Sequence, residues 1–344
     1  MSRTRALTIP STTLPVAARA ATAAGALGAL AGMALLRRSR RRATTDPNDP
    51  AHYDLPAGEN RVVRTDDGAE LAVSDVGQGP AVVLAHCWMG AREVWAPVAH
   101  RLVTSGHRVV LYDQRGHGSS TVGSDGFTIP RLGADLAAVL EALDLREAVL
   151  AGHSMGGMTV MSLLAHHPDV ARDRGRAAVL VATAAGGLAG SMPRRAENLL
   201  ASPAVDRLLR SGYGPSLQRA VVGARPCRDH LVRWRDVMVA CPADTRIGWL
   251  RAMRDMDLRP ALASVELPVT ILVGSHDRVT PPRFAWELAR LMPAARLRVL
   301  EGHGHTLPFE AAGDVAGELA EATRATRATA STPPPAGVPA GQPA

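Results

Sequence analysis

Gly152-His153-Ser154-Met155-Gly156 has the form Gly-x-Ser-x-Gly, and the residues on either side make it informative. The apolar run 148–151 precedes it and favours a buried strand, and the longer apolar run 157–165 follows it and favours a helix. A serine on a tight turn between strand and helix is lifted clear of the backbone, with the next amide beside it at the helix N-terminus. We therefore predict that Ser154 is a nucleophile. A glycine-rich turn that holds a structural serine is the alternative.

A serine hydroxyl is a weak nucleophile at neutral pH and needs a base, which a third group must orient. In a sheet built from such units, the acid and then the histidine follow the serine along the chain. Asp277 comes just after the apolar run 269–273 and is the predicted acid, with capping of a helix near Pro281 as its alternative role. The loop after 177–185, the other position for such an acid, contains no carboxylate.

Two histidines follow the strand-like run 296–300, in Gly302-His303-Gly304-His305. We expect His305 to be the base, because the glycine before it suits the bend that brings the ring to the serine. His303 is expected to be solvated or to lie behind the base.

The negative oxygen that forms during attack on a carbonyl needs two backbone donors. One is expected to be the amide of Met155, which follows the serine. The other is expected from the loop after the strand-like run 81–85, where the amide of Trp88 is the predicted donor. In the same loop, His86 is expected to be a structural hydrogen-bonding residue and not a catalyst.

The segment 113–120, Asp-Gln-Arg-Gly-His-Gly-Ser-Ser, follows another strand-like run. We predict a structural turn beside the site, with a second site as the alternative. No group of residues has the spacing of metal ligands, and no glycine-rich phosphate loop appears, so no cofactor and no metal is expected. Cys87, Cys227 and Cys241 are odd in number and widely spaced, which argues against a disulfide framework and fits a reducing compartment.

Short apolar runs alternate with helical patterns along most of the chain. An opening hairpin is expected from 62–65 and 70–76. The later runs are mostly continuous, as in strands of a parallel sheet buried on both faces, and they lie at 81–85, 108–112, 148–151, 177–182, 269–273 and 296–300. Helices are expected at about 92–105, 130–144, 155–166, 281–292 and 311–325. The alternation predicts an α/β fold with three layers.

The alternation stops between about 187 and 262, where a polar-faced helical pattern carries dispersed Trp and Met residues. We predict that this stretch is a helical cap inserted into a single domain of residues 60–322. Residues 46–59 are expected to form a polar linker. The tail, 323–344, consists of Ala, Thr, Pro and Gly for the most part and is expected to be disordered.

Residues 1–45 contain eight arginines and no acidic residue, and 14–36 form an Ala- and Gly-rich apolar run interrupted only by Arg19. The run approaches the ~20 residues that span a bilayer, and the arginine-rich cluster 37–42 follows it. The favoured expectation is a single membrane anchor with the main domain on the cytoplasmic side. A surface-lying or disordered leader on a cytoplasmic protein is the alternative. A cleaved signal peptide is disfavoured, because the charge follows the apolar run and no small-residue cleavage site is present.

The net charge of +7 does not indicate nucleic-acid binding. All 39 basic residues are arginine, and taking the eight in the leader from +7 leaves the other 299 residues near −1. The body of the protein therefore lacks the basic surplus of a nucleic-acid-binding domain, and no such partner is expected. Hydrophobic residues make up 46% of the chain, enough for a sizeable core.

Over roughly residues 60–322 the chain resembles the α/β-hydrolase superfamily. The resemblance rests on the 86–90 loop, the 113–120 turn, the Ser154 turn, Asp277 and the 302–305 segment. The Asp-x-Arg-Gly-x-Gly turn and the Gly-His-Ser-Met-Gly-Gly sequence look most like the branch of esterases, lipases and cofactor-free haloperoxidases. The resemblance implies a three-layer α/β-hydrolase fold with a mostly parallel sheet.

The chain departs from that branch at Cys87, where the resemblance implies a glycine. A side chain there would narrow the site or shift the oxyanion loop. A serine at position 154 argues against the dehalogenase and epoxide-hydrolase branches, which the resemblance associates with an aspartate nucleophile.

These observations together predict a serine hydrolase that cleaves a carboxylic ester through an acyl-enzyme. Ser154 would attack, His305 would act as base and Asp277 would orient it. The amides of Trp88 and Met155 would hold the oxyanion. The Trp- and Met-containing cap suggests a substrate with an apolar acyl or alcohol part.

Two other classes of function stay open. Acyl or peracid transfer, thioester cleavage and C–C bond hydrolysis would use the same residues. A non-enzymatic ligand-binding protein on this fold is the third reading. The expected partner is a small-molecule ester, and the sequence leaves the oligomeric state open.

Overall fold

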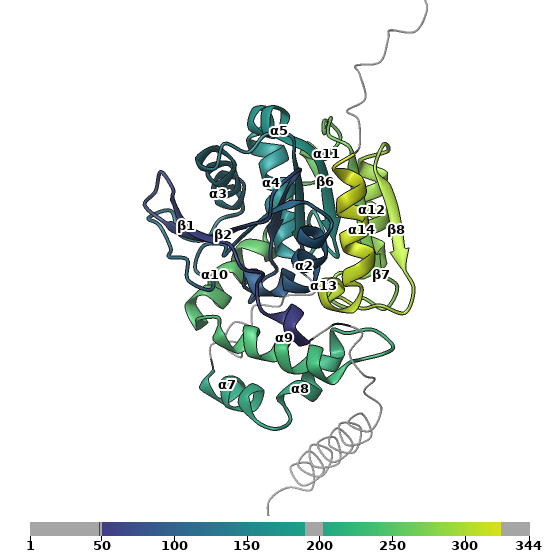
Figure 1. The fold of residues 1–344 in the computed structure, drawn as a ribbon. Coiled ribbons are helices and arrows are strands. Elements are labelled where there is room, and N and C mark those ends of the chain that lie inside the picture. Colours follow the sequence, from purple (N-terminus) through teal and green to yellow (C-terminus); the bar gives the residue numbers. More distant parts are fainter. Residues whose placement is uncertain (1–47, 49, 190–201, 325–344) are drawn as a thin grey trace, which may run out of the picture. The chain divides into compact units, whose positions relative to one another are not determined.

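A computed structural model describes residues 48, 50–189 and 202–324 (Figure 1). The chain divides into two compact units, 1–43 and 44–344, and every described residue belongs to the second. An eight-stranded sheet runs through this unit with helices on both faces, so the predicted three-layer α/β fold is confirmed.

The sheet has the strand order β1-β2-β4-β3-β5-β6-β7-β8. The first two strands form the predicted hairpin, in which Arg64 lies opposite Glu70, and β2 also pairs antiparallel with β4. All later pairs are parallel. The strands are β1 Glu59–Arg64, β2 Glu70–Val76, β3 Ala81–Ala85, β4 Arg108–Tyr112, β5 Ala148–His153, β6 Gly175–Val181, β7 Val269–Gly274 and β8 Arg296–Leu300.

Two groups of helices cover the sheet. On one face lie α2 (Ala96–Thr104) and α14 (Ala312–Ala322), whose apolar residues share one core cluster. On the other face lie α3 (Ile129–Ala142), α4 (Met155–His166) and α12 (Pro282–Leu291), which share the second. Shorter elements are η1 Pro50–Tyr53, η2 Arg92–Trp95, α5 Pro168–Arg174 and α13 Leu307–Glu310.

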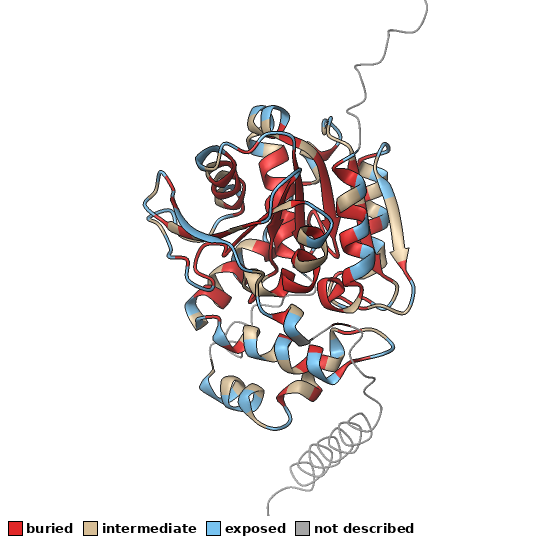
Figure 2. Cartoon of the chain, viewed as in Figure 1, coloured by how far each residue is buried: buried red, intermediate tan, exposed pale blue. Residues whose placement is uncertain are grey.

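Alternate residues of the central strands belong to opposite clusters. On β5, Leu150 packs in the cluster under α3 and α4, whereas Val149 and Ala151 pack in the cluster under α2 and α14. Both faces are buried, as Figure 2 shows, so the strands have no polar face and read as continuous apolar runs.

The predicted helical cap is present between β6 and β7. Its described helices are α7 Pro203–Arg210, α8 Gly214–Leu217, η3 Gln218–Ala220, α9 Arg228–Ala240, α10 Ala243–Arg254 and α11 Arg259–Leu262. Helix α10 is fixed to the body of the domain: the buried indole N–H of Trp249 donates to the carbonyl of Arg115 at 3.1 Å. The hydroxyl of Thr245 donates to the carbonyl of Gly116 at 2.9 Å.

The segment before β1, predicted as a linker, packs on the domain where it is described. Asn48 is 6% exposed, and its side-chain amide donates to the carbonyl of Phe309 at 3.1 Å. The ring of Tyr53 is buried against Phe309 and His230, the latter on cap helix α9. A few separated side chains make these contacts, so the polar composition of the stretch gave no sign of them.

A buried ion-pair cluster ties the 113–120 turn to the hairpin and to α3. The guanidinium of Arg115, whose side chain is fully buried, donates to Asp135 at 2.7 and 2.6 Å and to Asp67 at 2.9 Å. Hydrogen bonding from Arg115 lowers the pKa of Asp67 below its usual value. The segment therefore acts as a structural turn, as predicted.

The membrane anchor predicted at residues 14–36 is corrected, together with the membrane-associated location that rested on it. In the part of the chain that the structure describes, no helix combines the length and apolarity needed to cross a bilayer. Residues 14–36 themselves lie outside the described residues. The run consists mainly of Ala and Gly, whose small side chains offer little apolar surface to lipid.

Arg115→Leu is expected to lower the free energy of unfolding by about 3–5 kcal/mol, because it removes the buried cation between Asp67 and Asp135 and leaves these carboxylates only the longer contacts to Arg131, at 3.3 and 3.8 Å. Denaturant unfolding measures the change. Arg146→Leu is the matched control, since its ion pair with Asp173 is exposed on both sides and contributes little. Equal effects of the two substitutions would contradict the assignment.

Candidate active site

Ser154 sits on a strained turn at the carboxyl end of β5. Its backbone angles, φ 54° and ψ −114°, lie in a region that residues other than glycine rarely adopt. Such strain costs on the order of 1–3 kcal/mol and persists only where the surroundings enforce it. Here the amide of Ser154 donates to Val181 at 2.9 Å, and its carbonyl accepts from the hydroxyl of Thr183 at 2.7 Å.

Two glycines let three backbone segments meet around this serine. A Cβ on Gly152 would lie 2.0 Å from the carbonyl oxygen of Gly156, and one on Gly156 would lie 2.0 Å from that of Ala85. The first amides of α4 therefore lie beside the end of β3. Strand order reverses between β3 and β5, which is where open α/β sheets place their ligands.

His305 and Asp277, predicted from separate loops, lie together. The Nδ1 of His305 is 2.9 Å from Oδ2 of Asp277, and both side chains are at most 5% exposed. A carboxylate in this position orients the ring so that Nδ1–H donates to it and Nε2 keeps its lone pair. The loops after β7 and β8 supply the two residues.

The second oxygen of Asp277 accepts from the amides of Val279 and Thr280 at 2.8 and 2.9 Å. Burial favours the neutral carboxyl, but His305 and these hydrogen bonds outweigh it and lower the pKa of Asp277 below its usual value. The group is thus a charged acceptor near neutral pH. Its partners precede α12, which begins at Pro282 without a side-chain cap, so Asp277 does not have the helix-capping role.

His153 brings the His305 segment against the serine turn. Its Nε2–H donates to the carbonyl of His305 at 2.8 Å, and the two rings are 4.9 Å apart. Burial lowers the pKa of His153 to about 3, so its ring is neutral at ordinary pH. The residue directly before Ser154 therefore contacts the backbone of the predicted base.

The two predicted oxyanion donors lie at adjoining segments. Met155 is the first residue of α4, and among the described residues neither its amide nor that of Trp88 donates to another backbone carbonyl. The next amide in the loop, that of Met89, is occupied by Nε2 of His117 at 3.2 Å. The indole of Trp88 donates to the carbonyl of Arg246 in α10, which fixes the side chain against the cap.

A buried network behind this loop holds its shape. Nε2 of His86 accepts from the amide of Gln114 at 2.9 Å, which leaves Nδ1–H to donate to the carbonyl of Cys87 at 2.7 Å. The side-chain amide of Gln114 donates to the carbonyl of His86 and accepts from the hydroxyl of Thr159 on α4. His86 thus has the structural role expected of it, and Gln114 links both predicted oxyanion segments.

Cys87 does not narrow the approach to the serine. Its side chain is 2% exposed and packs in the cluster under α2, whereas Trp88 packs against the opposite cluster. Burial raises the pKa of the Cys87 thiol to about 12, so it stays protonated at neutral pH.

His303 joins the histidine segment to the loop that carries Asp277. Its carbonyl accepts from the amide of His276 at 2.9 Å, and its Nδ1 has no hydrogen-bond partner within the described part of the chain. The sequence reasoning missed Gln114, Thr159, Thr183 and Thr280 as supports of the site. Only Gln114 stood in a recognisable motif. Thr159 and Thr183 gain their roles from contacts far apart in the sequence, whereas Thr280 lies three residues from the carboxylate that it contacts.

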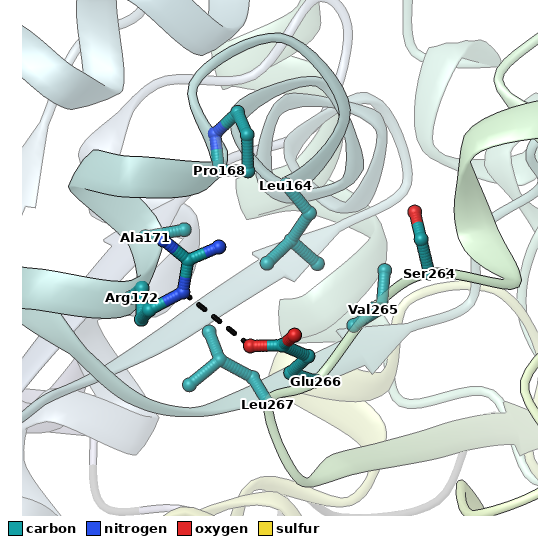
Figure 3. A pocket seen from close by; sticks show the side chains of 8 residues that line it. All are labelled: Leu164, Pro168, Ala171, Arg172, Ser264, Val265, Glu266 and Leu267. Carbon is teal, nitrogen blue, oxygen red and sulfur yellow. Dashed lines mark hydrogen bonds and ion pairs between the residues drawn. The ribbon is translucent and has the colours of Figure 1, made fainter.

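A separate cavity of about 240 Å³ lies between α4, α5 and the segment before β7 (Figure 3). Its lining includes the ion pair of Arg172 and Glu266 at 3.4 Å, and both of these side chains are largely exposed. The lining comes from the C-terminal end of α4 and from the chain that enters β7. The cavity therefore lies at the amino ends of the parallel strands, whereas Ser154 lies at their carboxyl ends.

Three buried histidines around the site predict acid sensitivity. Burial lowers the pKa values of His86, His117 and His153 to about 4, about 3 and about 3. In the unfolded chain each titrates near 6.5. Below that pH the unfolded state binds protons that the folded state does not, so the stability present at neutral pH is lost as pH falls toward the folded values.

We expect the free energy of unfolding to fall from about pH 6.5 to 5, with a proton uptake approaching about three. His117→Gln should reduce that uptake by about one, which denaturant unfolding at several pH values measures. An unchanged slope in the variant would contradict the buried neutral ring.

Comparisons with known proteins give the family of the chain. A family model described as alpha/beta hydrolase fold matches residues 80–216. A non-heme chloroperoxidase from Streptomyces lividans is 31% identical over 260 residues, which are 71% of this chain and 92% of the relative. A bifunctional esterase/perhydrolase from Acinetobacter calcoaceticus is 28% identical over 259 residues, 72% of this chain and 93% of the relative.

Among solved structures, an esterase from Exiguobacterium antarcticum superposes with a TM-score of 0.69 at 22% identity, over 78% of this chain and 100% of that one. At that identity the likeness shows the fold alone. A relative at 31% identity matched over 92% of its length, together with this sheet order, means that the chain belongs to the α/β-hydrolase superfamily.

Proposed function

We propose that the protein is a serine esterase that cleaves a carboxylic ester through an acyl-enzyme. One observation carries the proposal: the ring of His305 is held 2.9 Å from Asp277 and lies against the residue that precedes the strained Ser154. A serine, a histidine and a buried carboxylate in this relation suit acyl transfer. The esterase named among the relatives supports ester cleavage as the reaction.

In the first half-reaction, Oγ of Ser154 attacks the ester carbonyl while Nε2 of His305 takes its proton. Asp277 stays ionised and stabilises the imidazolium that forms. The negative oxygen of the tetrahedral intermediate accepts hydrogen bonds from the amides of Met155 and Trp88. His305 then gives its proton to the leaving alcohol, which departs and leaves the acyl group on the serine.

In the second half-reaction, His305 removes a proton from water, which attacks the acyl carbonyl. The same two amides stabilise the second tetrahedral intermediate. As it collapses, the bond between Oγ and the acyl carbon breaks, His305 returns the proton to Oγ, and the acid leaves. No metal or cofactor takes part in either step as we propose it.

An apolar acyl or alcohol part fits the surroundings. The side chain of Trp88, the residue whose amide is a predicted oxyanion donor, is only partly buried and packs against an apolar cluster that contains Met155 and Trp249. Thioether and indole side chains accommodate apolar groups of varied shape.

Peracid formation is a second candidate, because a bifunctional esterase/perhydrolase is among the relatives. Hydrogen peroxide would replace water as the nucleophile that attacks the acyl-enzyme, and the peroxy acid would leave in place of the acid. Product analysis with and without peroxide, at a constant ester concentration, separates the two.

Ser154→Ala is expected to lower kcat for p-nitrophenyl esters on the order of 10⁶-fold, because it removes the attacking atom. The matched control is Ser162→Ala on the same helix, whose buried hydroxyl donates to the carbonyl of Ile129 at 2.7 Å. The control should lose about 1 kcal/mol of stability and keep its kcat. Comparable turnover by Ser154→Ala and wild type would refute the proposal.

Asp277→Asn is expected to lower kcat about 10⁴-fold at neutral pH, since a neutral amide neither fixes the required tautomer nor stabilises the imidazolium. Asp75→Asn is the control. Its carboxylate pairs with Arg108 at 2.7 Å and lies on β2, near one end of the strand order, whereas Asp277 follows β7, near the other end. Steady-state kinetics on both variants test the difference. A similar, small loss in both would remove Asp277 from the mechanism.

A further inference from the structure

The cap contributes backbone contacts directly to the segment that carries His305. The amide of His305 donates to the carbonyl of Val221 at 2.8 Å, and the amide of Ala224 donates to the carbonyl of Gly302 at 2.8 Å. These two bonds pair cap residues 221–224 with residues 302–305 in opposite directions. We call this contact the cap–histidine pair.

The two backbone segments of the pair are in direct contact, with no side chain between them. A Cβ on Gly223 would lie 2.1 Å from the carbonyl oxygen of Gly302, and a Cβ on Gly304 would lie 2.4 Å from the carbonyl carbon of Val222. The cap segment cannot shift toward the histidine segment, so its position sets that of the residues around His305.

One carboxylate holds both sides of the cap–histidine pair. Oε2 of Glu310, at the end of α13, accepts from the amide of Gly223 at 2.7 Å and from the amide of Gly304 at 3.0 Å. Oε1 accepts from the amide and the hydroxyl of Thr306 at 3.1 and 2.6 Å. Glu310 therefore binds both chain neighbours of His305 and the cap at once.

We propose that Glu310 is a positioning residue for His305, and that through it the seated cap sets the geometry of the base. This inference rests on the proposed function, in which His305 moves the proton. The backbone of His305 is held by Val221 of the cap and by His153, and Asp277 holds only its ring. Glu310 is the charged acceptor that keeps the flanking amides, and with them the backbone of His305, in register with the cap.

A positioning role makes a different prediction from a purely stabilising one. A displacement of about 1 Å at a reacting group can cost on the order of 100-fold in rate without changing how the substrate binds. Loss of Glu310 should therefore reduce kcat and leave KM close to that of the wild type. Loss of stability alone would lower the amount of active protein and leave kcat per folded molecule unchanged.

The first test is Glu310→Gln, which puts a side-chain amide against backbone amides that need acceptors. We expect kcat per folded molecule to fall about 10- to 100-fold with KM within about twofold of wild type. The rate of labelling of Ser154 by a fluorophosphonate should fall by a similar factor. The matched control is Glu318→Gln. Glu318 lies on α14, is 5% exposed, and pairs with Arg298 of β8 at 2.7 Å. The substitution should lower the melting temperature and leave kcat unchanged.

The second test approaches the pair from the cap. Gly223→Ala inserts a methyl group where the Gly302 carbonyl stands, so it should separate the two segments and lower kcat and the labelling rate as Glu310→Gln does. Gly317→Ala is its control, because a Cβ on Gly317 meets nothing within 4 Å. The folded fraction of each variant, from thermal unfolding, normalises every rate.

The outcomes separate the two proposals. Absence of both labelling and ester turnover in the folded wild type would refute the serine-esterase function itself. A wild type that labels, with Glu310→Gln and Gly223→Ala at wild-type kcat per folded molecule, would overturn the positioning role alone. A loss of kcat and of labelling rate in these two variants, with kcat and labelling rate unchanged in both controls, would support it. This holds whether or not the melting temperature of a variant changes.

Discussion

The strained turn at Ser154 is the constraint on which the rest of the site depends. A φ of 54° at a residue with a side chain is unfavourable, and the protein maintains it with hydrogen bonds to the serine amide and carbonyl from the β6 end. The close approaches at Gly152 and Gly156 keep the first turn of α4 against the ends of β5 and β3. Any larger side chain at either glycine would push α4 away from β5 and β3, and the oxyanion amides would separate.

Hydrogen bonds from buried polar side chains hold the loops around this turn in place. Gln114 spans the end of β3 and the first turns of α4, and the neighbouring Arg115 anchors the same loop to Asp67 and Asp135. Each group is hydrogen-bonded, which is the condition under which buried polar groups can be tolerated. The neutral rings of two histidines complete this layer: His86 accepts from the amide of Gln114, and His117 accepts from the amide of Met89, which is therefore not free. The result is a site whose free amides are few and fixed.

Much of the fold could be predicted from local pattern because both faces of the sheet are buried. Strands such as Ala148–His153 appear as apolar runs, and the helices α3 and α14 carry an apolar stripe. Short elements were harder. Helix α5 was missed. It follows directly after the helix predicted at about 155–166 and begins at Pro168, a position where the missing N–H costs nothing.

The positions of Ser154, Asp277 and His305 were inferred from where strands end, and the structure brings the last two within 2.9 Å; their catalytic roles stay predictions. The contacts of Asn48, Thr159 and Glu310 could not be inferred, because each joins segments far apart in the chain and has no local signature. The anchor predicted in the leader is corrected on the described residues alone, among which no helix could cross a bilayer; residues 14–36 lie outside them.

The central claim is that the strained turn presents Ser154 to two free amides and an oriented histidine. The most direct measurement is a crystal structure of the protein after reaction with a phosphonate ester. We predict phosphorus bonded to Oγ of Ser154, with one phosphoryl oxygen about 2.7–3.1 Å from the amides of both Met155 and Trp88. A phosphoryl oxygen directed away from both amides, or phosphorus bonded to a different residue, would contradict the account.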